Sequence, residues 1–331
     1  MKALKASGQE NSRRQGSSQA RRLAAGCLLM LLAVGTAAQN DDDATRGLWD
    51  TAFLQQRPQG RASNSRRRPA YRPAGTNKPA RVETATSKSV VGITVWRLRP
   101  SMPADEVRQL IHGQQGEWTP ERVGTGEPLR EGERIQITVE APRSGYLYVF
   151  DREVYADRSL GDPYLIFPTT AIRGGDNLVR AGRVIEIPSS EDKPPFYTIQ
   201  RSRPDYDGEL LTVLITDAPL DELSLGPGAL KLPQQQVESY EKKWGADVDN
   251  IELVGGPGTP MTGAEKQAAQ GKQMLTRSDP MPQSIYRVRS KPGAPLLLSV
   301  FLRIKPLTEH AGIIRPPNFS GRIVTVQQAD L

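Results

Sequence analysis

The chain has 331 residues, of which 37% are apolar, 24% are charged and 6% are aromatic, as in a globular protein long enough for more than one domain. Its formal net charge is +7, yet residues 1–90 carry 16 Lys or Arg against six acids, whereas residues 91–331 carry 28 against 31. Because the basic excess lies at the N-terminal end, we expect no basic folded surface and no nucleic-acid partner.

The N-terminal end has the outline of a signal peptide, predicted over residues 1–38. Six Lys or Arg precede an apolar run over residues 23–38, which ends in the small residues Ala37 and Ala38. As a helix, 16 residues span roughly 24 Å, short of the roughly 30 Å hydrocarbon core, so a permanent anchor is the weaker alternative. We therefore expect an extracytoplasmic protein, periplasmic or secreted, with no membrane span after cleavage. The single cysteine, Cys27, leaves with the signal, so the mature chain can form no disulfide.

Residues 39–88 are poor in apolar side chains and rich in Arg, Pro, Gly, Ser and Asn, which predicts a disordered basic linker. Between Thr51 and Val82 the chain has eight cations and no acid. This arm is either a self-repelling spacer or an electrostatic anchor to an anionic envelope polymer or phospholipid surface. Trp49 and Phe53 form a small apolar island within it, a candidate for a short docking helix.

The folded part is predicted to begin at about Ser89. Residues 90–98 (VVGITVWRL) indicate a strand, and residues 103–112 (PADEVRQLIH) have helical spacing with a proline in the first turn. Residues 133–141 (ERIQITVEA) alternate apolar and polar side chains strictly, which predicts a half-buried strand. Residues 145–150 (GYLYVF) are apolar or aromatic on both faces and predict a central strand that is covered on both sides.

A series of short apolar runs follows, separated by Gly, Pro and Asp: residues 163–168, 183–188, 194–201 and 209–220. Two runs near the end, 284–290 and 295–304, flank KPGAP and predict a hairpin. Between them and the earlier strands, the stretches QQQVESYEKKWG and AEKQAAQGK have helical spacing and predict a helical insertion at about 230–275.

Short strands at this spacing, without alternating helices, predict a mainly β fold. We expect an antiparallel β-sandwich, Ig-like in general architecture, over residues 89–305, with a few short helices in the insertion. Residues 306–331 form a C-terminal tail, which ends in a candidate edge strand or partner-binding segment.

Four stretches in this region share an order of elements with a known family. They are SGYLYVFDRE, GDPYLIFP, RGGDNLVRAGRVIEIP and GELLTVLITDAPL. In this order the chain resembles the bacterial domain of unknown function 4384 over about residues 130–220, and the longer match resembles secreted members that carry this domain almost alone. The resemblance implies an extracytoplasmic, mostly β module. It implies no catalytic residues.

A search for catalytic and metal-binding patterns finds little. Only His112 and His310 are present as histidines, and no GxSxG elbow, Walker loop or dinucleotide glycine fingerprint occurs, so we predict no catalytic residue and no cofactor. The loop after the central strand carries four weak calcium candidates that do not follow EF-hand spacing: Asp151, Glu153, Asp157 and Asp162. A plain connection between strands is the favoured interpretation. An envelope hydrolase using these carboxylates and a calcium-stabilised structural module are the alternatives.

The remaining functional signal is a cluster of rings beside arginines. Tyr and Arg are the residue types favoured at interface hot spots, so exposed members of this cluster are candidates for a binding patch. The candidates are Tyr155, Tyr164, Arg173, Arg180, Tyr197 and Arg201. Together with the signal peptide and the basic arm, they lead to the hypothesis of an exported non-enzymatic β-sandwich that binds a protein or an anionic cell-envelope polymer.

Overall fold

The computed structural model describes residues 53–59, 71–73, 87–111 and 113–306. The predicted signal peptide, most of the predicted linker and the C-terminal tail from residue 307 lie outside these residues. No helix among the described residues is long and apolar enough to cross a membrane.

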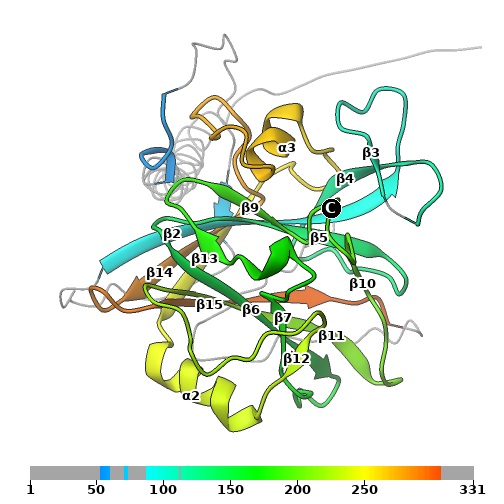
Figure 1. The fold of residues 1–331 in the computed structure, drawn as a ribbon. Coiled ribbons are helices and arrows are strands. Elements are labelled where there is room, and N and C mark those ends of the chain that lie inside the picture. Colours follow the sequence, from blue (N-terminus) through cyan, green and yellow to red (C-terminus); the bar gives the residue numbers. More distant parts are fainter. Residues whose placement is uncertain (1–52, 60–70, 74–86, 112, 307–331) are drawn as a thin grey trace, which may run out of the picture. The chain divides into compact units, whose positions relative to one another are not determined.

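The described chain folds into two antiparallel sheets (Figure 1). The larger sheet follows the path β1 (Tyr71–Pro73), β13 (Asp247–Leu253), β14 (Ser284–Ser290), β2 (Ser87–Pro100), β4 (Glu117–Val123) and β3 (Gln109–Leu110). β2 also pairs with β5, which carries two further neighbours: β5 (Arg134–Glu140), β9 (Val184–Ile187) and β10 (Tyr197–Thr198). The long β2 therefore connects the two halves of this sheet.

The smaller sheet is built around two eleven-residue strands, β6 (Gly145–Tyr155) and β11 (Tyr206–Thr216), which pair along their whole length. Its remaining strands are β12 (Leu230–Lys231), β7 (Tyr164–Phe167), β8 (Leu178–Val179) and β15 (Leu296–Arg303). β6 lies between β7 and β11, which confirms the central strand predicted at residues 145–150.

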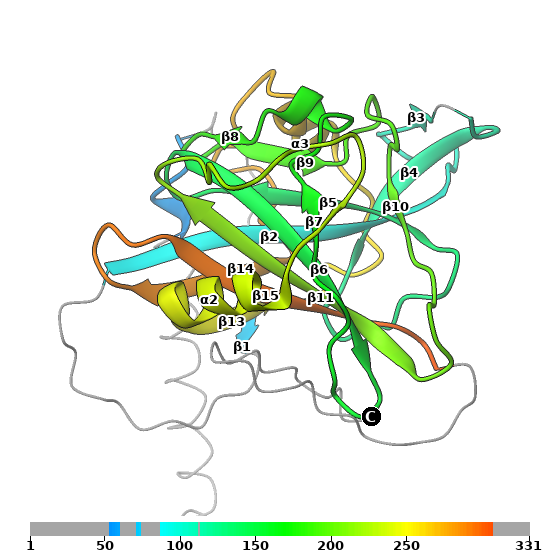
Figure 2. The same cartoon turned by 60° about the horizontal axis from the view of Figure 1, so that its bottom comes forward.

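The two sheets lie one over the other (Figure 2), and the main core contains buried residues from both. The larger sheet contributes alternate residues of β2 and β5, and the smaller sheet contributes Leu147 and Val149 of β6 with Leu211 and Val213 of β11. Alternation of buried side chains along facing strands is the pattern of a sandwich. The predicted mainly β, antiparallel sandwich is confirmed, and the Ig-like detail stays a prediction.

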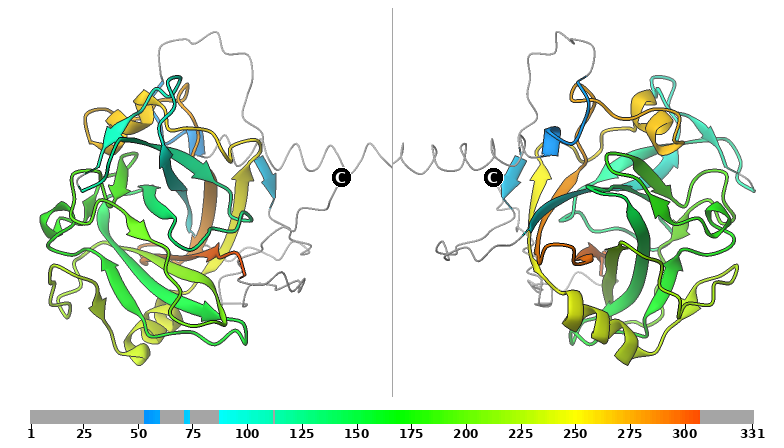
Figure 3. Two further views of the ribbon diagram at one scale, coloured as in Figure 1. Left: turned by 90° about the vertical axis from the view of Figure 1, so that its right-hand side faces the viewer. Right: turned by 60° about the vertical axis from the view of Figure 1, so that its left-hand side comes forward.

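A helix covers the outer face of the smaller sheet. α2 (Gln234–Trp244) places the ring of Tyr240 5.9 Å from that of Phe150, and Trp244 stacks on Tyr240 at 5.1 Å. These contacts explain why β6 is aromatic on its outer face as well as apolar on its inner face. α3 (Gly263–Ala269) lies on the opposite outer side, over the larger sheet (Figure 3). Its first turn is fixed by a capping box between Thr262 and Glu265.

β5 departs from the half-buried strand predicted at residues 133–141, because its polar face is buried too. Gln136, Thr138 and Glu140 are all less than 10% exposed. Each has a hydrogen-bond partner from elsewhere in the chain: Gln136 donates to Pro195 O at 2.8 Å, and Thr138 accepts from the Trp96 indole at 2.9 Å. A second, polar layer therefore covers the outer face of this sheet.

Residues 53–59 belong to this layer, although a disordered linker was predicted over 39–88. Phe53 is fully buried, and Arg57 makes a bidentate ion pair with Glu140, with nitrogen–oxygen distances of 2.8 and 2.6 Å. The backbone of β1 pairs with β13. For residues 53–59 and 71–73 the prediction of disorder is wrong, because each stretch has its own bonding partner on the domain.

The helix predicted at residues 103–112 is not formed. Residues 103–106 make turns instead, and β3 follows at residues 109–110. The cause is Asp105, whose carboxylate accepts from Met102 N at 2.6 Å and from the Arg99 guanidinium at 2.6 and 2.7 Å. The Arg99 guanidinium holds the pKa of this carboxyl well below its usual value. Asp105 thereby fastens a turn to β2 where the apolar spacing alone favours a helix.

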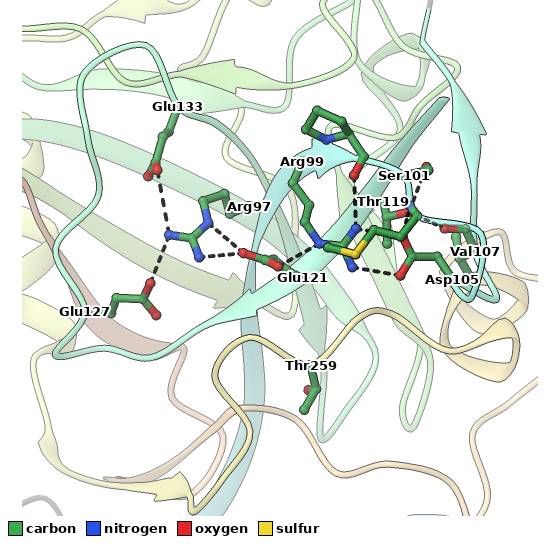
Figure 4. A network of polar contacts seen from close by, with 12 residues as sticks. Arg97, Arg99, Ser101, Asp105, Val107, Thr119, Glu121, Glu127, Glu133 and Thr259 are labelled. Carbon is green, nitrogen blue, oxygen red and sulfur yellow. Dashed lines mark hydrogen bonds and ion pairs between the residues drawn. The ribbon is translucent and has the colours of Figure 1, made fainter. Parts of the chain in front are cut away.

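The same corner contains a network of ion pairs around Glu121 (Figure 4). Glu121 binds both Arg97 and Arg99, at 2.5 and 2.8 Å, and Arg97 also contacts Glu127 at 2.9 Å and Glu133 at 3.7 Å. Each guanidinium thus has carboxylate partners. The network holds β2 and β4 together and leaves neither of its guanidinium groups without a carboxylate partner.

The last two long strands do not form the predicted hairpin. β14 pairs with β13 and β2 in the larger sheet, whereas β15 pairs with β11 in the smaller one. KPGAP therefore carries the chain from one sheet to the other. The predicted insertion at about 230–275 does contain both helices, but it also contains β13, a strand of the larger sheet that the sequence analysis missed.

Candidate functional site

The main candidate site is a cleft of about 690 Å³ between residues 173–192 and the C-terminal end of α3. One wall is formed by a 3-10 turn, η1 (Arg173–Gly175), with β8 and β9; the other is formed by residues 269–272. Figure 1 shows α3 above β9 on the outer side of the larger sheet. The volume lies within the range of small-ligand pockets.

The wall around η1 is held in an irregular conformation by one carboxylate. Arg173 has φ 53°, in the left-handed region, and is followed by Gly174 and Gly175 with positive φ. Asp192 accepts from Arg173 N at 2.8 Å and from Ser189 N at 2.7 Å. Two backbone N–H groups on one carboxylate fix the two ends of this wall against each other, so the cleft has a preformed frame.

A buried ion pair lies beside the cleft. Glu186, on β9, is 1% exposed and lies 2.9 Å from the ammonium of Lys266, on α3. Lys266 also donates to Gln109 Oε1 at 2.9 Å. Burial raises the pKa of the Glu186 carboxyl, and the charge of Lys266 opposes that rise. This pair ties α3 to β9, and its Glu186 lines the cleft.

The rim of the cleft carries cations that are not neutralised. Arg180, Arg183 and Lys272 have no ion-pair partner within 4 Å among the residues the structure describes. The two arginines flank a turn in which Arg183 N donates to Arg180 O at 3.0 Å. Gly182 in that turn has φ 68°, and an added Cβ there would meet Gln56 O at 3.2 Å. The ordered part of the N-terminal arm therefore supports the turn that presents both guanidinium groups.

The acids of the cleft are mostly engaged. Glu186 is bound by Lys266, Asp192 by two backbone N–H groups, and Asp176 lies 3.7 Å from the Arg173 guanidinium. Only Glu191 keeps an unengaged carboxylate, so the cleft holds no free pair of acids for general acid–base chemistry. The arrangement suits binding of an anionic group by guanidinium and ammonium groups.

Two of the six predicted patch residues, Arg173 and Arg180, line this cleft. The other four lie elsewhere and serve other contacts. Tyr155 is buried under Arg203, Tyr197 donates to Ile166 O at 3.0 Å, Arg201 donates to Tyr206 O at 3.0 Å, and Tyr164 is 39% exposed on β7. The six candidates therefore do not form one continuous patch.

The weak calcium candidates do not meet at one point. Asp157 accepts from Ser159 and Asp162 pairs with Lys231, while Glu153 accepts from Tyr155 and Ser202. Asp151 is half-buried on the inward face of β6, diagonal to Glu209 on β11. Within residues 53–306, as far as they are described, no group of three His, Cys, Asp or Glu side chains is placed to hold a metal ion.

Residues 128–204 match the model of a family described as a domain of unknown function, DUF4384. The chain carries a DUF4384 domain. The matched segment supplies β5, β9 and β10 to the larger sheet and β6, β7 and β8 to the smaller one, so DUF4384 accounts for part of both layers. No curated protein and no solved structure matches the chain.

The cleft lies at the border of the DUF4384 segment. Its η1, β8 and β9 wall is inside the match, whereas α3 and Lys272 are outside it. Arg183 could have been found from sequence, because it stands with Arg180 in the family-like stretch LVRAGRVIEIP. Lys272 and Lys266 could not, since they lie about 80 residues further along the chain and only the packing of α3 on β9 brings them to the site.

Proposed function

We propose that this protein is an exported, non-catalytic binding module that takes an anionic group of a partner protein or cell-envelope polymer into the cleft beside α3. The observation that carries the proposal is the set of three unneutralised cations, Arg180, Arg183 and Lys272, on the rim of a preformed cleft. Neighbouring like charges repel one another, and an anion bound between them relieves that repulsion. Guanidinium groups bind carboxylate and phosphate oxygens bidentately, which adds geometric specificity.

The N-terminal sequence supports the exported part of the proposal. A basic stretch, an apolar run and small residues at the end are the parts of a signal peptide. The remaining basic arm would then work as a spacer or as an additional electrostatic contact to an anionic surface. Its ordered residues 53–59 keep one end of this arm on the domain, next to the cleft.

The test compares two double variants of the mature chain from Gln39, R180Q/R183Q and a control, R130Q/K291Q. Arg130 and Lys291 are exposed cations away from the cleft, so both variants lose the same charge. We expect R180Q/R183Q to weaken retention on a purified anionic envelope fraction at least tenfold, with the control within twofold of the wild type. Equal weakening of both variants would mean that the cleft cations contribute no more to retention than other exposed cations of the protein. Unchanged retention of R180Q/R183Q would refute the proposed site.

A further inference from the structure

A second hollow of about 450 Å³ lies along α3 and adjoins the first. The two share Ser190, Glu191 and Gln270. Along the second hollow, α3 presents Gly263, Lys266, Gln267 and Gln270, which follow the i, i+3, i+4, i+7 spacing of a single helix face. The two hollows therefore form one groove, which follows that face of α3 and bends around its C-terminal end to the cations.

The far wall of this groove is formed by five consecutive residues, 106–110, of which Gln109 and Leu110 form the short strand β3. β3 within this segment pairs only with β4 and ends the path of strands in the part of the sheet that is described. No residue of β4 lines the groove, whereas both residues of β3 do.

The two ends of the groove differ in chemistry. The cleft end has the unneutralised Arg180, Arg183 and Lys272. The β3 end has Leu110, whose side chain is 76% exposed. An occupant that fits both ends is long, carries acids at one end and an apolar group at the other, and has backbone groups that can pair with a strand edge.

We propose that the groove binds an extended acidic peptide segment of a partner protein, which adds as a strand to the edge of β3 and places its carboxylates on the Arg180–Arg183 turn. This inference rests on the proposed function and specifies its ligand. Backbone hydrogen bonds from β3 supply affinity that does not depend on the peptide sequence, and the cations and Leu110 select for acidic and apolar side chains. A flexible anionic polymer without amide groups cannot form these backbone hydrogen bonds with β3.

The test uses the mature chain from Gln39 and three probes: a fluorescent ten-residue peptide of alternating Val and Glu, the same peptide N-methylated at every second residue, and inorganic polyphosphate. N-methylation removes the donors needed for strand pairing but keeps the charge and leaves the protein unaltered. We expect the plain peptide to bind at least tenfold more tightly than the N-methylated one. We also expect it to slow hydrogen exchange of residues 106–110.

Two protein variants separate this inference from the proposed function. Leu110→Ser is expected to weaken peptide binding several-fold and to leave polyphosphate binding unchanged, whereas R180Q/R183Q is expected to weaken both. Equal affinity for the two peptides, or no change in exchange at residues 106–110, would overturn strand addition while leaving an anion site in place. If R180Q/R183Q changes no affinity relative to R130Q/K291Q, the proposed function itself fails.

Discussion

Replacing Arg57 by alanine is expected to lower the free energy of unfolding by about 3–5 kcal/mol, because it leaves the buried carboxylate of Glu140 without a partner. The Arg57 side chain is 0% exposed and that of Glu140 is 4% exposed. Besides the two bonds to Glu140, the guanidinium donates to Pro280 O at 2.9 Å and makes longer contacts to Asp279 O and Thr276 O. The ring of Phe53 lies 5.3 Å from its central carbon. A substitution in a segment that composition assigns to a disordered linker therefore disturbs the interior of the domain.

Urea unfolding of the single variants R57A and E140A and of the double variant measures this directly. The double variant is expected to lose about 2 kcal/mol less than the sum of the single losses, since neither partner is then left buried alone. Arg130→Ala, at an exposed arginine, serves as the control and is expected to stay within about 0.5 kcal/mol of the wild type. An R57A loss as small as this control's would show that residues 53–59 add nothing to the fold. A chain that starts at Ser89 lacks this anchor altogether, so it is expected to unfold at lower urea concentration than the chain from Gln39.

The strands could largely be predicted because alternation of side chains is a local property. The runs that became β2, β5, β6, β9 and β11 were all recognised from their apolar periodicity. What periodicity cannot tell is what covers the other face of a strand. The alternating pattern predicts a solvent-exposed polar face for β5, but Glu140 on that face is covered by an arginine 83 residues earlier in the chain.

The connections were harder to predict than the strands, because tertiary partners decide them. Asp105 ends a helical pattern only because Arg99 stands opposite it on β2. KPGAP has the composition of a hairpin turn, but β15 finds eight backbone partners on β11 and none on β14. In both cases the local sequence favours the predicted element, and contacts with residues distant in the chain stabilise a different structure.

Arg57 shows how composition misleads when it is averaged over a segment. Eight cations lie between Thr51 and Val82, and the low apolar content of the segment predicts disorder for all of them. The apolar island of Trp49 and Phe53 is the local sign that part of this segment docks on the domain. The cleft shows the same limit. Arg173 and Arg180 were predicted from the sequence as patch residues, but Lys272 could not be, because only the packing of α3 brings it to the cleft.

The stability of the protein is expected to fall as the pH rises above about 4, because two half-buried carboxyls lie beside each other on the smaller sheet. Asp151 and Glu209 are diagonal neighbours on the inward face of the β6–β11 pair. Burial is the main cause that raises the pKa of both groups, and the charge of Asp151 raises that of Glu209 further. Tyr206 donates its hydroxyl to Glu209, while one buried oxygen of Glu209 and one of Asp151 have no hydrogen-bond partner, so a proton shared between the two carboxyls would satisfy both. The folded protein therefore keeps protons that the unfolded chain releases near pH 4.

Each proton held only by the folded state lowers the free energy of unfolding by up to about 1.4 kcal/mol per pH unit, so stability present below pH 4 is lost as the pH rises through neutrality. Glu209→Gln keeps a donor to Asp151 but cannot ionise. Urea unfolding between about pH 5 and 8 is expected to show a slope that is shallower by about 1 kcal/mol per pH unit in this variant, and a more stable protein at pH 8. Asp221→Asn, at an exposed acid, is the control and is expected to keep the wild-type slope. Parallel slopes for Glu209→Gln and the wild type would mean that the two carboxyls are ionised in the folded protein and do not share a proton.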